Sequence, residues 1–164
     1  MRGLQERGAV AALSRPGRLL VTGAVAAAVV AADQVTKAVA VAHLHRPVHV
    51  VGPFGLDLGY NTGSAFSLFT ADAAVLTAVA VLLVAVLCWL AWRAPNAPVA
   101  VAVGLVLGGA LGNLCDRAAR GRVVDFVTLT HWPTFNVADA CITVGIVLLV
   151  VFYWRAASPA RRPS

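Results

Sequence analysis

Long apolar stretches divide the chain into four segments, which shorter polar stretches separate. Each apolar segment has about the ~20 residues that a helix needs to cross the hydrocarbon core of a bilayer. The pattern therefore predicts four transmembrane helices, at about residues 19–42, 73–92, 97–115 and 137–154. The second and third segments are joined by "RAPNAP", which is short and rich in turn-forming residues, so these two helices are expected to be antiparallel neighbours.

The first segment has a second interpretation, because arginines followed by "LLVTGAVAAAVVAA" also resemble a cleavable secretory signal. The helical pattern continues, however, through "DQVTKAVAVAHL", where Asp33 and Lys37 lie four residues apart and share one face of a helix. Such a pair can neutralise its own charge. An uncleaved membrane span is therefore the preferred prediction.

Two longer segments between the spans carry β-strand patterns. The first, residues 43–72, contains "VHVVGPFGLDLGYNTG", in which short β-prone runs flank Gly and Pro and favour a hairpin. The second, residues 116–136, contains the strand-like "RVVDFVTLTHW". The predicted fold is an all-α membrane protein of one domain, residues 1–164, in which four transmembrane helices carry a small extracytoplasmic β-sheet, or cradle, formed by the two outer loops.

Composition places this domain in a membrane. Hydrophobic residues make up 60% of the chain and charged residues only 12%, whereas soluble domains carry roughly 25% charged residues. The net charge is +6 and arginines crowd both ends, which suits contact with the phospholipids of an anionic cytoplasmic leaflet. Nucleic acid is not expected as a partner, because no basic patch with interleaved aromatic residues is present.

The distribution of Lys and Arg predicts the orientation. If residues 1–18 and 156–164 are cytoplasmic tails, the cytoplasmic side holds eight arginines: Arg2, Arg7, Arg15, Arg18, Arg93, Arg155, Arg161 and Arg162. The opposite side then holds four: Arg46, Arg117, Arg120 and Arg122. The sequence therefore predicts a multi-pass protein with both termini in the cytoplasm.

Carboxylates near the ends of the spans are the main chemical signal. An ionisable residue at membrane depth suggests function by default, because an Asp at the centre of a spanning helix costs roughly 2.5–3.5 kcal/mol. In the predicted orientation Asp116, Asp125 and Asp139 all lie at the outer face. Two carboxylates that meet cannot both ionise easily, so one keeps its proton while the other acts as a base. Asp125 and Asp139 therefore suit an aspartic protease, which activates a water held between two carboxylates.

Simpler interpretations exist for the same residues. Asp139 can cap its helix or match the helix dipole. Asp116 and Arg117 can form a structural ion pair, and Asn113 and Asn136 can hydrogen-bond across helices.

Two other patterns have a structural interpretation. Gly108 and Gly112, spaced as G-x-x-x-G, are most simply a site of close helix packing. The four histidines lack the paired spacing of metal ligands, so no metal site is predicted.

Two other classes of protein compete with a protease. A small proton-coupled transporter would relay protons through Asp33, Asp125 and Asp139, and it predicts ionisable groups throughout the depth of the membrane. In this sequence they gather at one face, and the second helix is bare of charge. A non-catalytic assembly factor predicts that Asn in place of Asp125 or Asp139 leaves function intact.

Five motifs occur in the order seen in bacterial lipoprotein signal peptidases, the signal peptidase II family, which this chain resembles. They are "DQVTK" (33–37), "NTGSAFS" (61–67), "GGALGNLCDR" (108–117), "GRVVDF" (121–126) and "FNVADA" (135–140). The resemblance covers nearly the whole chain outside the tails.

The resemblance implies an aspartic endopeptidase of the bacterial cytoplasmic (inner) membrane, with its active site at the outer face. No metal or cofactor is expected, and nothing in the sequence demands more than a monomer. Its substrates would be diacylated prolipoproteins, cut before a cysteine that carries diacylglycerol. The matching motifs make Asp125 and Asp139 the catalytic pair. Residues matching positions that shape the site are Asn113, Asp116, Arg117 and Asn136. Residues in the remaining functional motifs are Asp33, Lys37, Asn61 and Gly63.

Overall fold

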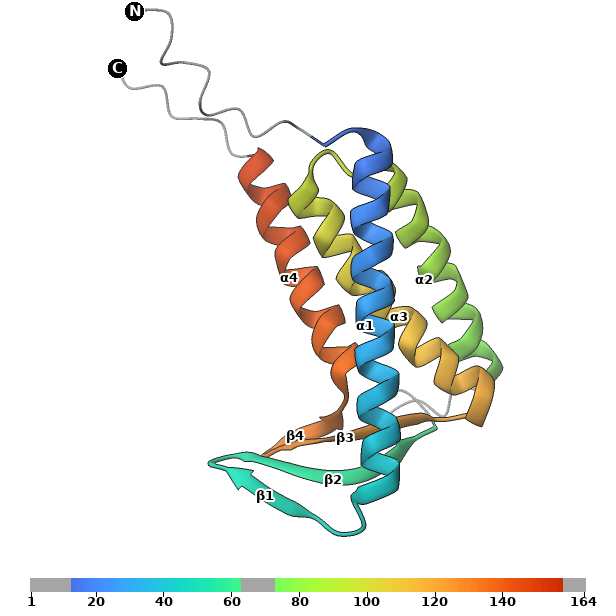
Figure 1. Ribbon diagram of the computed structural model, residues 1–164, viewed down its shortest axis with the longest axis vertical. Helices are drawn as coiled ribbons and strands as arrows, with labels where there is room; N and C mark the ends of the chain where they lie inside the picture. The colour runs from blue at the N-terminus through green and yellow to red at the C-terminus, as the bar shows by residue number, and fades with distance from the viewer. Residues whose placement is uncertain (1–12, 63–72, 158–164) are drawn as a thin grey trace, which may run out of the picture.

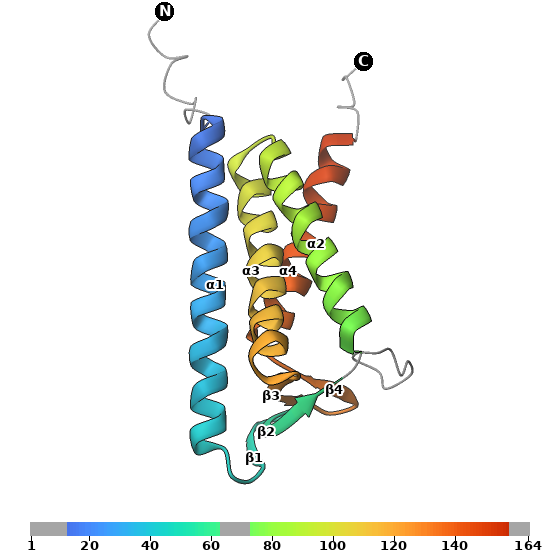
Figure 2. The same cartoon turned by 90° about the vertical axis from the view of Figure 1, so that its right-hand side faces the viewer.

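The computed structural model describes residues 13–62 and 73–157, which form four helices and four strands (Figure 1). The helices are α1 (Arg15–His43), α2 (Ala73–Arg93), α3 (Ala97–Arg120) and α4 (Val137–Ala157). The strands are β1 (Val48–Val51), β2 (Phe54–Asn61), β3 (Val123–Leu129) and β4 (Trp132–Phe135). The start of α1 and the end of α4 lie at one end of the bundle, and the sheet lies at the other (Figures 1 and 2).

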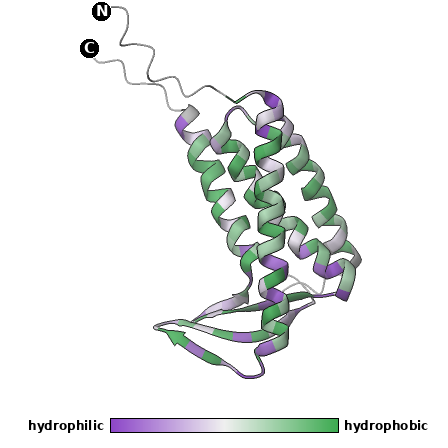
Figure 3. Ribbon diagram, in the orientation of Figure 1, coloured by the Kyte–Doolittle hydropathy of each residue, from purple (hydrophilic) through white to green (hydrophobic). Residues whose placement is uncertain are grey.

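The helices have the apolar surface of a membrane protein. Three of them, α1, α3 and α4, are long and apolar enough to cross a bilayer. The described apolar part of α2, Thr77–Arg93, is shorter, although the whole helix has 21 residues. Large apolar side chains such as Leu20, Leu82 and Val150 are exposed on the outside of the bundle, and hydrophilic segments gather near the helix ends and in the sheet (Figure 3). The predicted fold class, a helical membrane protein with a small sheet, is confirmed.

Helix α3 is the centre of the bundle and packs against the other three helices. Glycines on two of its faces make this close approach possible. A Cβ atom added at Gly108 would lie 2.7 Å from the Ala26 carbonyl oxygen of α1, and one at Gly109 would lie 2.5 Å from the Ala138 carbonyl oxygen of α4. The expected role of Gly108 in helix packing is therefore confirmed.

The two outer segments pair with each other into one antiparallel sheet of order β1-β2-β3-β4. Strands β1 and β2 form the predicted hairpin, and β2 pairs with β3 of the second segment. In this register Gly59 lies opposite Asp125 and Tyr60 lies opposite Val124. Successive residues of a strand face opposite sides of a sheet, so this register decides which side chains of β3 face the helix bundle.

Helix α3 is longer than the sequence predicted. It continues past residue 115 to Arg120 and ends at Gly121, which adopts the left-handed conformation (φ +68°) and donates its backbone N–H to the Arg117 carbonyl oxygen. Such a glycine is a common helix stop. The consequence is that Asp116 lies on a helix, buried in the bundle, instead of in an outer loop.

Candidate active site

Asp125 lies in β3 at the level where the sheet meets the helices. Its side chain is only 2% exposed. The Asn136 amide nitrogen donates to Asp125 Oδ1 at 2.6 Å, and the side chain of Asn61 from β2 also hydrogen-bonds this carboxylate. The residues on either side of Asp125 are apolar and buried as well, so β3 brings one carboxylate into a largely dry region.

Asp139 lies in the first turn of α4 and takes part in a reciprocal cap with Asn136. The Asp139 backbone N–H donates to Asn136 Oδ1 at 2.9 Å, and the Asn136 backbone N–H donates to Asp139 Oδ2 at 3.3 Å. This is the geometry of a capping box. The capping interpretation of Asp139 is therefore correct for one oxygen. The other, Oδ1, accepts a hydrogen bond of 2.8 Å from the Asn113 amide of α3.

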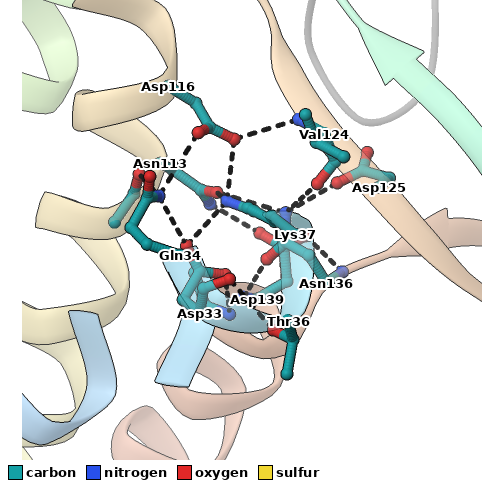
Figure 4. Close-up of polar contacts among 12 residues, drawn as sticks. Asp33, Gln34, Thr36, Lys37, Asn113, Asp116, Val124, Asp125, Asn136 and Asp139 are labelled. Carbon is teal, nitrogen blue, oxygen red and sulfur yellow. Dashed lines mark hydrogen bonds and ion pairs between the residues drawn. The ribbon is translucent and has the colours of Figure 1, made fainter. Parts of the chain in front are cut away.

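The two carboxylates are joined through one residue. The backbone of Asn136 binds Asp139 while its side-chain amide binds Asp125, so both acids lie next to the same fully buried asparagine (Figure 4). Asp139 is half-buried whereas Asp125 is buried. Water therefore has access to the pair from the Asp139 side.

The environment of Asp125 raises its affinity for a proton. Burial, followed by the nearby charge of Asp139, raises the pKa of Asp125 from 3.8 to about 6. Hydrogen bonds from Asn136 and Asn61 act in the opposite direction but are outweighed. The arrangement can thus hold a proton on Asp125 while Asp139 acts as a base.

Beneath the pair lies a buried ionic cluster centred on Lys37, the only lysine of the chain. Lys37 is fully buried, and its Nζ lies 2.8 Å from Asp33 Oδ2 and 3.0 Å from Asp116 Oδ2. Asp116 is also bound by Arg120 at 2.6 Å. Two acids and two bases therefore balance, which is the condition under which charges are tolerated in a protein interior.

The cluster determines how Asn113 is turned. Lys37 Nζ donates to Asn113 Oδ1 at 3.0 Å, and a lysine can only donate. The amide nitrogen of Asn113 must then face the other way, toward Asp139 Oδ1. The buried cation of α1 therefore fixes the donor that holds the carboxylate of α4.

Asp33 ties α1 directly to the start of α4. Its Oδ1 accepts a hydrogen bond of 3.0 Å from the Ala138 backbone N–H, one of the free donors in the first turn. Its Oδ2 lies against α3, where a Cβ atom added at Gly112 would be 2.7 Å away. Gly112 therefore gives room to a carboxylate, and the pair with Lys37 is part of the site and not only a membrane anchor.

Most of the residues that the sequence singled out meet in this one place. The network contains Asp33, Lys37, Asn61, Asn113, Asp116, Asp125, Asn136 and Asp139. The expected ion pair between Asp116 and Arg117 is wrong, because Asp116 pairs with Lys37 and Arg120 instead. Arg120 is one turn further along α3, so its side chain reaches the same face as Asp116. Gly63 lies outside the described residues.

Gln34 is the member of the network that the sequence analysis missed. Its amide nitrogen lies 3.2 Å from Asp33 Oδ2, from the Gly112 carbonyl oxygen and from Asp116 Oδ1. The sequence did contain a signal for Gln34, because it is a second polar residue next to Asp33 in an otherwise apolar helix. Across residues 13–62 and 73–157, no three His, Cys, Asp or Glu side chains come together in a way that could hold a metal ion.

Comparisons with known proteins agree with the resemblance in the motifs. The family model described as signal peptidase (SPase) II matches residues 25–155. A lipoprotein signal peptidase of Mycobacterium avium (strain 104) is 43% identical over 145 residues, which cover 83% of this chain and 80% of that protein. A protein of the same name from Rhodococcus jostii (strain RHA1) is 44% identical over 143 residues, covering 82% of this chain and 72% of that protein.

The fold is also similar to that of a solved protein. A structure described as a bacterial membrane enzyme superposes with a TM-score of 0.77 at 25% sequence identity, and the match covers 87% of this chain and 93% of that one. The range matched by the family model includes both acids and the ionic cluster beneath them.

Proposed function

The chain belongs to the signal peptidase II family, and from this premise we propose that Asp125 and Asp139 are the two groups with which it hydrolyses its substrate. As a member of that family it is a membrane peptidase that removes signal peptides from prolipoproteins. The observation that carries the proposal is that Asn136 hydrogen-bonds both carboxylates, one through its backbone and one through its side chain.

In the proposed mechanism Asp139 is the base and Asp125 is the acid. Asp139 takes a proton from a water molecule, which attacks the scissile carbonyl carbon, while Asp125 donates its proton to the carbonyl oxygen. The tetrahedral gem-diol then collapses as the C–N bond breaks: the amine nitrogen takes the proton that Asp139 gained from water, and Asp125 regains its proton from one of the two hydroxyls. Because the pair exchanges protons as a unit, its titration belongs to both residues.

The amides and the ionic cluster keep this pair in position. Asn113 and Asn136 direct N–H groups at the carboxylates, and Lys37 holds Asn113 in the required orientation. A buried catalytic group loses much of its effect when it moves by about 1 Å. We therefore assign a positioning role to these three residues, together with Asp33 and Asp116.

The substrate side of the proposal rests on where the acids lie. Asp125 is in β3 and Asp139 is in the first turn of α4, so both lie at the end of the bundle that carries the sheet (Figure 1). A cleavage site next to a diacylglyceryl cysteine would be held at this depth by its acyl chains. We propose cleavage before that cysteine at the outer face of the cytoplasmic membrane, with both termini in the cytoplasm, by a monomer in contact with phospholipids.

The proposal is tested by cleavage of a diacylated prolipoprotein in detergent or in lipid. Asp125→Asn and Asp139→Asn are each expected to lower kcat by at least about 10³-fold, the scale seen when a group that acts as part of a catalytic unit is removed. Asp57→Asn is the matched control, because Asp57 is an exposed carboxylate on the same sheet.

Two outcomes would contradict the proposal. Cleavage by either active-site variant at more than about a tenth of the normal rate would show that the acids are not the catalytic pair. An unlipidated precursor cut as fast as the lipidated one would exclude a role for the diacylglyceryl group in recognition.

A further inference from the structure

A pocket lies on the opposite side of β3 from the Asp125 side chain. It has a volume of about 550 Å³, within the range of ~300–1,000 Å³ that is usual for small-molecule sites. Its wall is formed by one residue of α1, by the end of β2 and by the corner between α3 and β3. The lining residues are Val41, Tyr60, Thr62, Arg120, Gly121, Arg122 and Val124.

The alternation of side chains along the strands separates this pocket from the acids. Val124 lies opposite Tyr60 in the register of the sheet, so both face the pocket. The next residue of each strand, Asp125 and Asn61, faces the other way, toward the catalytic network. The two sites therefore lie back to back, and Arg120 connects them, because it binds Asp116 of the ionic cluster and also lines this pocket.

The charge in this pocket is positive. Arg120 binds Asp116 through one nitrogen, and its side chain is 42% exposed. Arg122 forms no ion pair with any residue that the structure describes. Since the buried cluster of two acids and two bases is already neutral, Arg122 adds an uncompensated positive charge at the mouth of the pocket.

The guanidinium of Arg122 is held in place before any ligand arrives. Its Cζ atom lies 3.8 Å from the centroid of the Tyr60 ring, which is a stacked cation–π contact. Stacking uses the flat face of the guanidinium and leaves its N–H edge free to bind two oxygens of one ligand. Carboxylate and phosphate are the oxyanions whose geometry this edge matches.

The surroundings of the two arginines indicate what kind of oxyanion the pocket binds. Val41 supplies an exposed apolar wall from the last turns of a membrane-spanning helix, beside the two arginines. The strands and helix ends that line the pocket meet at the end of the bundle that carries the sheet (Figure 1). A ligand with a phosphodiester and acyl chains would meet both kinds of wall at once.

We propose that this pocket binds the phosphodiester headgroup of an anionic phospholipid, with Arg122 and Arg120 on the phosphate and the acyl chains along Val41. The inference narrows the proposed contact with phospholipids to one site. The test of this inference measures binding and not cleavage. The lipid-binding proposal can therefore fail while the peptidase proposal stands, and the peptidase proposal can fail while lipid binding stands.

The full chain in a zwitterionic detergent is titrated with dihexanoyl phosphatidylglycerol, and NMR follows the Arg122 Nε–H and Gly121 backbone N–H signals. We expect a saturable shift that weakens as salt is added. Arg122→Gln is expected to weaken binding about tenfold, the effect of losing a charge-assisted hydrogen bond, as followed on Gly121. Arg122→Lys should give an intermediate loss, because it keeps the charge and loses the planar edge.

The chain offers a matched control. Arg93 also stacks on an aromatic ring, with its Cζ atom 5.1 Å from the centroid of Trp89, but it lies at the opposite end of the bundle and lines no part of this pocket. Arg93→Gln should leave the titration unchanged. Circular dichroism and thermal unfolding of each variant show whether it is folded.

Three results would overturn the proposal. The first is no saturable shift with phosphatidylglycerol, and the second is an equal loss of binding in Arg93→Gln and Arg122→Gln. The third is inorganic phosphate binding as tightly as the lipid, which would assign the pocket to a soluble anion. Dihexanoyl phosphatidylcholine is expected to bind more weakly than phosphatidylglycerol, because its choline cancels the negative charge.

Discussion

The carboxylate of Asp125 is expected to make the protein less stable at neutral pH, and its removal should make the protein more stable. Burial and the charge of Asp139 raise the pKa of Asp125 to about 6. A folded-state pKa above the unfolded value means that the folded protein prefers the protonated form. The penalty is therefore absent near pH 4, grows between about pH 4 and 6, and is complete above pH 6.

The size of this effect follows from the pKa. A rise from 3.8 to about 6 corresponds to about 3 kcal/mol, at 1.36 kcal/mol per pH unit. Water that reaches the half-buried Asp139 also screens the pair, so about 1–2 kcal/mol is a better expectation. In Asp125→Asn the amide oxygen can still accept the hydrogen bond from Asn136, so the variant loses the charge and keeps the contact.

Thermal unfolding followed by tryptophan fluorescence at pH 8 and pH 4.5 tests this reasoning. Asp125→Asn should raise Tm by roughly 2–6 °C at pH 8, and the gain should be much smaller at pH 4.5. Asp57→Asn, an exposed carboxylate on the same sheet, should give no such gain. A gain of equal size at both pH values, or a lower Tm at pH 8, would refute the argument that the carboxylate of Asp125 is strained by burial and by its neighbour.

Three further predictions follow from other parts of the site. Replacing the buried Lys37 by Met leaves Asp33 without its cation and Asp116 with Arg120 alone, and it should cost about 3–5 kcal/mol of stability by denaturant unfolding; in the native protein, an amine-specific reagent should not modify Lys37, as peptide mapping will show. Gly109→Ala would place a Cβ 2.5 Å from the Ala138 carbonyl oxygen and should lower stability by about 1–3 kcal/mol, whereas Gly23→Ala, with nothing within 4 Å, should be neutral or slightly stabilising. If Asp125 donates the proton, kcat/KM should fall as pH rises through an apparent pKa at or above about 6, and a profile flat from pH 5 to 9 would contradict its role as the acid.

Hydropathy and local pattern were sufficient to predict the elements. Apolar runs of about twenty residues can only be satisfied as helices in a bilayer, because every backbone polar group must be paired within the segment. Alternation around Gly and Pro was sufficient for the hairpin at residues 48–61. The end of α3 was misplaced because the run of apolar residues stops before the helix does. The last turns carry Asp116 and Arg120, which pair with each other across one helical turn, and Asp116 is also bound by Lys37 of α1.

The motifs singled out the two acids, and the sequence by itself determined that carboxylates gather near the ends of the spans. Only the tertiary structure decided which charged side chains form ion pairs. Asp116 and Arg117 are neighbours in sequence, yet successive residues of a helix point about 100° apart, and Asp116 takes Lys37 and Arg120 instead. The orientation of Asn113 depends on a lysine 76 residues away. The separation of two sites by one strand depends on a register that pairs Tyr60 with Val124. The hydropathy pattern of a segment predicts its secondary structure. The protonation of a carboxylate such as Asp125 depends on groups that come together only after folding.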